Sequence, residues 1–70
     1  MTIKLNIDTN IQNVASEYLI RYNIKHTWDN FDPTNQRVTL ICYCFSLLDS
    51  MYILYLALAY DGLKINDLIQ

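Results

Sequence analysis

Hydrophobic and polar residues alternate at the start of the chain and later recur at helical spacing. Within residues 2–7, Ile3, Leu5 and Ile7 share one face at the two-residue period of a strand. Farther along, the apolar positions follow a 3.6-residue period, which predicts an amphipathic helix over 9–23. A single short strand is not stable alone, so the N-terminal segment is expected to lie extended over helices or to pair with another chain.

The next segment, residues 23–36, has no clear period and is rich in Asn, Asp and Pro, which favour turns. It also contains Trp28 and Phe31. We therefore expect a long loop that is either pinned to the core or presented to a partner. Asp32 and Pro33 close the segment and are typical of a helix start, because Asp caps and Pro suits the first helical position.

Residues 38–60 form an almost uncharged apolar run. Its first residues have the β-branched and aromatic composition of a strand, whereas the preceding cap favours a helix. Asp49 lies in the middle of the run. A buried, unpaired carboxylate is costly, and Asp49 makes better sense as the cap of a new helix. The run is therefore predicted to form two helices, near 34–48 and 50–61.

These elements predict a mainly α protein, a single small domain over 1–70 with a short extended N-terminal segment. Its helices are expected near 9–23, 34–48 and 50–61. The alternative is an α+β fold of order β-α-β-α, in which strands near 2–7 and 37–44 are completed into a sheet by dimerisation. Seventy residues allow one domain, and a chain of this length has a marginal core.

The composition of the chain indicates that part of its surface is covered by another protein chain. Hydrophobic residues make up 53% of the chain and charged residues only 17%, whereas the surface of a small soluble domain usually carries about 25–35% charged residues. We therefore expect a larger protein partner, a homodimer or another homo-oligomer. The net charge is −2 and the five basic residues are scattered, so direct binding to nucleic acid is not expected.

Candidate chemistry is sparse. Cys42 and Cys44 are two residues apart, and a zinc site needs more ligands than these cysteines and His26 supply. We predict buried free thiols, no metal, no cofactor and a reducing, cytoplasmic location. His26 lies near Asp29, but no motif supplies the nucleophile and pocket that catalysis also needs. The chain is therefore predicted not to be an enzyme and to have no small-molecule substrate.

A membrane location is the second interpretation of residues 38–60. A transmembrane helix needs about 20 apolar residues, and the run is long enough. Its central acid and its internal tyrosines disfavour a span, because Tyr prefers the membrane boundary. A small membrane-associated protein with 38–60 in the bilayer stays as an alternative.

The aromatic residues suggest where a partner would bind, because Tyr and Trp are enriched at binding hot spots. The predicted partner-binding residues are Trp28, Asp29, Phe31, Asp32, Tyr43, Tyr52 and Tyr55. By elimination, the predicted function is that of a small protein–protein interaction module, a regulator or inhibitor that binds a larger protein. Small size and frequent residues with AT-rich codons suggest a phage or mobile-element origin. A structural subunit of a larger assembly is the other alternative.

Overall fold

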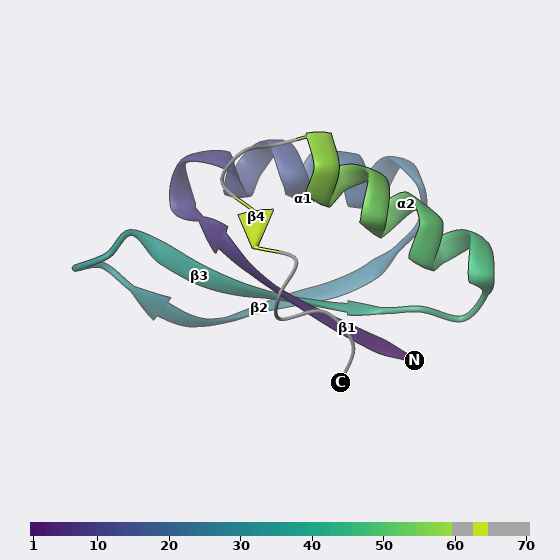
Figure 1. Ribbon diagram of the computed structural model, residues 1–70, viewed down its shortest axis with the longest axis horizontal. Coiled ribbons are helices and arrows are strands. Elements are labelled where there is room, and N and C mark those ends of the chain that lie inside the picture. The colour runs from purple at the N-terminus through teal and green to yellow at the C-terminus, as the bar shows by residue number, and fades with distance from the viewer. Residues whose placement is uncertain (60–62, 65–70) are drawn as a thin grey trace.

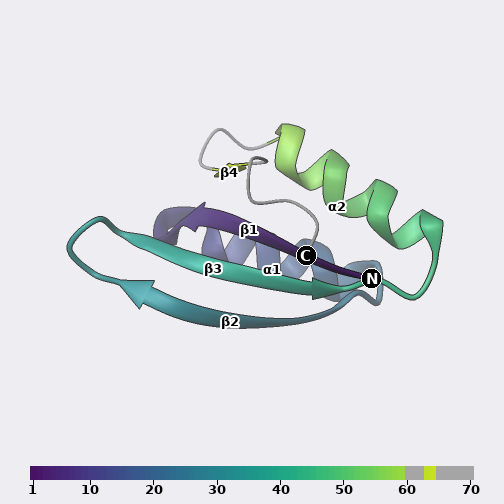
Figure 2. The ribbon, with the colours of Figure 1, turned by 60° about the horizontal axis from the view of Figure 1, so that its bottom comes forward.

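The computed structural model describes residues 1–59 and the backbone of Leu63–Lys64, and it has α+β architecture. Along the chain, its elements are β1 (Thr2–Asp8), the 3-10 helix η1 (Thr9–Ile11), α1 (Gln12–Arg21), β2 (Lys25–Asp32), β3 (Arg37–Tyr43), α2 (Leu47–Ala59) and the two-residue β4 (Leu63–Lys64). The strands form one antiparallel sheet in the order β2-β3-β1-β4. Both α-helices cover the same face of this sheet (Figures 1 and 2).

This topology places β3 between β1 and β2, the two strands that α1 connects. The order of elements and of strands is that of the split β-α-β, or ferredoxin-like, arrangement. Many unrelated functions use this arrangement, so it identifies no activity for the chain.

The mainly α prediction is wrong, because the segment expected as a helix near 34–48 contains β3, an interior strand of the sheet. Along β3, Val38, Leu40 and Cys42 are buried, while the residues between them are only half-buried. This two-residue alternation suits the β-branched composition of the segment. Both edges of β3 are paired, one with β1 and the other with β2.

The cap signal at Asp32 belongs to a hairpin turn instead of a helix start. One Asp32 oxygen, Oδ1, accepts hydrogen bonds from the backbone N–H groups of Thr34 (3.1 Å) and Asn35 (3.3 Å), and Asn35 Nδ2 donates to Oδ2 at 2.8 Å. Such side-chain bonding to a following backbone is how Asp stabilises turns. The loop expected over 23–36 is therefore largely strand β2 and the turn into β3.

The alternative fold placed strands near 2–7 and 37–44, where β1 and β3 lie. It had them complete a sheet by dimerisation, which the structure does not require. They pair directly within one chain, with Ile3 opposite Cys42, Leu5 opposite Leu40 and Ile7 opposite Val38. The alternative also missed β2, which forms the sheet edge.

The helical segment expected over 9–23 holds η1 and α1, and it ends in a Schellman motif. Asn23 adopts the left-handed conformation (φ 58°) and donates its N–H to the Ile20 carbonyl at 3.1 Å. Ile24 donates to the Leu19 carbonyl at 2.8 Å. These two bonds satisfy the last helical carbonyls and turn the chain into β2.

The last predicted helix, near 50–61, begins three residues earlier in the structure, and residues 60–61 lie outside the described part of the chain. Ser46 caps α2, since its Oγ accepts a hydrogen bond from the Asp49 N–H at 3.3 Å. Asp49 Oδ2 in turn accepts from the Phe45 N–H at 3.0 Å. This reciprocal arrangement is a variant of the capping box. Asp49 therefore caps α2 from inside its first turn.

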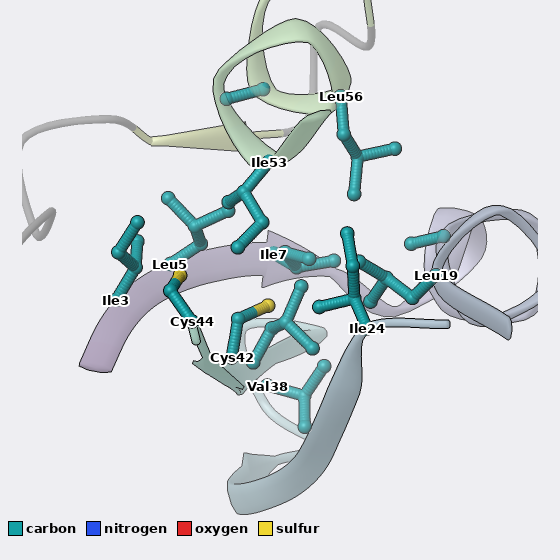
Figure 3. Packing of buried hydrophobic residues seen from close by; sticks show 13 residues of the cluster. Ile3, Leu5, Ile7, Leu19, Ile24, Val38, Cys42, Cys44, Ile53 and Leu56 are labelled. Atoms are coloured by element: carbon teal, nitrogen blue, oxygen red, sulfur yellow. The ribbon is translucent and has the colours of Figure 1, made fainter. Parts of the chain in front are cut away.

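The core lies between the helices and the inner face of the sheet (Figure 3). Its members are Ile3, Leu5, Ile7, Ala15, Leu19, Ile24, Val38, Leu40, Cys42, Cys44, Ile53, Leu56 and Ala57. Both cysteines are buried and free, as predicted. Burial raises the pKa of the Cys42 thiol to about 12 and also raises the pKa of Cys44.

Candidate protein-binding surface

One side of α2 is apolar and exposed to solvent along its whole length. The buried side holds Ser50, Ile53, Leu56 and Ala57. The opposite side, together with the residue at the foot of the helix, forms what we call the outer α2 face: Phe45, Leu47, Leu48, Met51, Leu54, Tyr55 and Leu58. The exposed fraction reaches 79% for Leu47 and 77% for Leu58. A helix that is apolar on both sides is typical of a buried helix, yet here only one side is covered.

The charged side chain of α2 lies in the first turn, next to Ser46, and not on the outer α2 face. Asp49 is the only charged residue within Leu47–Ala59, and its carboxylate is engaged with the Phe45 N–H at the start of the helix. The hydroxyl of Ser50 donates to the Leu47 carbonyl at 2.7 Å on the buried side. Asp49 and Ser50 therefore serve the first turn of α2, and the outer α2 face presents no charged side chain and one hydroxyl, that of Tyr55.

A tyrosine cluster borders this face where α2 lies beside α1. The ring centroids of Tyr22 and Tyr52 are 4.3 Å apart, and those of Tyr18 and Tyr55 are 6.5 Å apart. Tyr18 donates its hydroxyl to the Tyr52 carbonyl at 2.8 Å. With Leu48 and Met51 of the outer α2 face, these rings line a shallow groove of about 380 Å³. Stacking and the hydroxyl bond hold the two helices together and extend the apolar surface across them.

A second groove, of about 520 Å³, lies at the β2–β3 hairpin and holds three of the predicted binding residues. Its lining residues are Gln12, Trp28, Asp29, Asn30, Phe31 and Val38. Trp28 packs partly against the core, whereas Phe31 is 64% exposed. The pairing of β2 with β3 shifts register between Asp29 and Asp32, as at a β-bulge, and Asn30 takes a positive φ of 51°. We call this site the hairpin groove.

The other four predicted binding residues do not line the hairpin groove. Asp32 holds the hairpin turn, and its hydrogen bonds with Asn35 lower the pKa of its carboxyl. Tyr43 is the last residue of β3, on the uncovered face of the sheet and opposite Lys25 of β2. Tyr55 belongs to the outer α2 face, while Tyr52 is half-buried against Tyr22. The leucines and Met51 of the outer α2 face were not among the predicted residues.

Ser16 and His26 form a contact that linear spacing does not reveal. Ser16 Oγ lies 3.2 Å from His26 Nε2, and His26 Nδ1 lies 3.0 Å from the Ile24 carbonyl oxygen. A carbonyl only accepts, so Nδ1 donates to it, and in the neutral ring Nε2 accepts from the Ser16 hydroxyl. A serine nucleophile needs this polarity, but also an oxyanion site and a substrate pocket. Neither residue lines the hairpin groove, and the contact ties α1 to β2.

The described residues offer neither a metal site nor a membrane span. Within residues 1–59, no three His, Cys, Asp or Glu side chains come together as metal ligands. In the same part of the chain, no helix has the length and apolar character needed to cross a bilayer. The apolar run that suggested a span is divided between β3 and the 13-residue α2.

Comparison with known proteins adds no assignment. Searches against family profiles, curated proteins and solved structures gave no significant match. A functional proposal therefore rests on the surface geometry of this chain.

Proposed function

We propose that this chain is a small protein–protein interaction module, a regulator or inhibitor that works by binding. The outer α2 face carries the proposal. Six of its side chains belong to one side of a single helix, none is charged, and the helix is otherwise well anchored in the core. Contiguous apolar patches of this kind on small proteins mark interaction sites.

The hairpin groove supports the same function as a separate and smaller surface. Its exposed Phe31 and the half-buried Trp28 provide aromatic area, and the exposed Asp29 also lines the groove. An aromatic anchor with a polar rim is the usual anatomy of a protein interface. In this proposal, a larger protein binds at the hairpin groove. The binding takes place in a reducing compartment such as the cytoplasm, which suits the two buried thiols.

Affinity capture from cells of the source organism tests this function. We expect the wild-type chain to retain at least one protein that is lost with Met51→Lys on the outer α2 face or with Phe31→Ser in the hairpin groove. Both residues are exposed, so the substitutions should leave the fold intact, which circular dichroism checks. Thr27→Lys, at an exposed position on the other face of the sheet, is the matched control. Identical captured proteins for all four chains would contradict the proposal.

A further inference from the structure

The outer α2 face has the size of one side of a stable protein interface. From its exposed fractions, and with usual side-chain areas, it presents roughly 700 Å² of apolar surface. The largest patch on a typical monomer is about 300–600 Å², and a standard interface buries about 800 Å² on each partner. The face is thus large enough to hold two protein chains together without a contribution from charged groups.

The spacing of the residues along the middle of this face indicates a helix as the occupant. Leu47, Met51, Leu54 and Leu58 follow one another at intervals of four, three and four residues. This is the spacing of a coiled-coil seam, in which apolar side chains of one helix fit between those of another. A flat or extended partner would have no reason to match this spacing.

The absence of charged residues in the outer α2 face helps to identify the partner helix that packs on it. In a two-fold symmetric dimer the same patch packs against itself, so any charge near the axis meets an equal charge. The outer α2 face has no charged member, and apolar side chains are self-complementary. A different partner would commonly be matched by complementary charges, and the face offers none for such recognition.

We propose that the outer α2 face binds a second copy of this chain, forming a two-fold dimer in which the α2 helices pack antiparallel. This inference rests on the proposed function, because it names the occupant of that surface. The antiparallel arrangement opposes the two helix dipoles and separates the two Asp49 carboxylates. It also places Leu47 opposite Leu58 of the second copy and Met51 opposite Leu54 of the second copy. Each of these four side chains therefore faces an apolar side chain of the other helix.

The oligomeric state of the purified chain tests the dimer. Light scattering after size exclusion and sedimentation equilibrium should give twice the chain mass of 8.3 kDa for the wild type and for Thr27→Lys. Met51→Lys places a charge in the seam twice per dimer, so we expect its dimer dissociation constant to rise at least about 100-fold. Circular dichroism must show the same fold for all three chains.

Disulfide trapping tests the orientation. In an equimolar mixture of Leu47→Cys and Leu58→Cys chains, the antiparallel dimer predicts a disulfide between the two different chains. A parallel dimer would instead join Leu47→Cys to itself and would overturn the orientation. The native thiols are buried, and the wild-type chain serves as the background control.

The outcomes separate the dimer from the proposed function. A wild-type chain that is monomeric at every concentration overturns the dimer, while loss of a captured protein with Met51→Lys would still support the interaction module. A dimer that persists unchanged in Met51→Lys overturns the assignment of the interface to α2. Dimerisation of the wild type with loss of the dimer in Met51→Lys supports the dimer, while binding of a larger protein is tested separately by capture with Phe31→Ser.

Discussion

At the scale of single residues, a few polar side chains decide where the chain turns. Asn23, Asn30 and Gln36 all take a positive φ, at the end of α1, in the β2 bulge and at the end of the hairpin turn. Asn tolerates the left-handed region better than most residues, and it commonly ends helices there when Gly is absent. Between two of these positions, Asp32 organises the hairpin turn with its carboxylate. Turns set by such side chains are local features that can be tested one residue at a time.

The Asp32 carboxyl provides a direct test of the hairpin turn. Its pKa lies below the ordinary 3.8, chiefly because the Asn35 side chain donates to the ionised form. We expect Asn35→Ala to raise the Asp32 pKa toward its ordinary value, measured by carboxyl carbon chemical shifts during an NMR titration. Asn13→Ala, at an exposed position on α1, should leave it unchanged.

The direction of the pH effect follows from this lowered pKa. The hydrogen bonds to the ionised carboxylate stabilise the fold above the unfolded-state pKa, near 3.8. Their contribution is lost as the pH falls through the lower folded-state value. An Asp32 pKa that is the same in the wild type and in Asn35→Ala would contradict the role assigned to the Asn35 side chain.

At the scale of elements, local signals located several segments but did not decide their type. The alternation in β1 and the helical period of α1 are visible in the sequence because each element buries one face only. The Asp32 signal was ambiguous, since the same carboxylate can cap a helix or a turn. Strand β2 was not recognised because it is a sheet edge whose side chains, apart from His26, Trp28 and Asp32, are exposed.

The candidate binding surface could likewise be predicted only in part from the sequence. The excess of apolar residues in 38–60 predicted that a surface needs cover, but any of the apolar positions in the run could equally belong to the core. The structure was needed to divide α2 into a buried side and an exposed side. The 4-3-4 spacing from Leu47 to Leu58 is present in the sequence, where other apolar residues of the same helix conceal it. Of the residues predicted for binding, Tyr55 alone lies on the outer α2 face.

The contribution of the Ser46 cap to the stability of α2 can be measured by substitution. Ser46→Ala removes the acceptor for the Asp49 N–H and should lower the free energy of unfolding by about 1 kcal/mol. Ser46→Asp keeps an acceptor at the same position and should retain most of the stability. Urea denaturation at a fixed chain concentration measures both. Equal loss in the two variants would mean that the Ser46 hydroxyl does not cap the helix.

At the scale of the whole molecule, the two candidate surfaces are far apart in the fold. The start of α2 lies at the opposite end of the molecule from the β2–β3 turn (Figures 1 and 2). A dimer formed through α2 would therefore leave both hairpin grooves accessible and would present them to a larger partner in pairs. Two-fold symmetry also closes the assembly, so this interface would give a discrete dimer that does not grow further.

Thermal unfolding connects the dimer with the stability of this small domain. Because association stabilises only the folded chain, the melting temperature of a dimer rises with its concentration. We expect this rise for the wild type and for Thr27→Lys, measured by circular dichroism over a wide range of concentrations. Met51→Lys should melt at a temperature independent of concentration and close to that of the dilute wild type, because Met51 is 58% exposed in the single chain. A wild-type melting temperature that does not change with concentration would show that folding and association are not linked, and would contradict a dimer held by the outer α2 face.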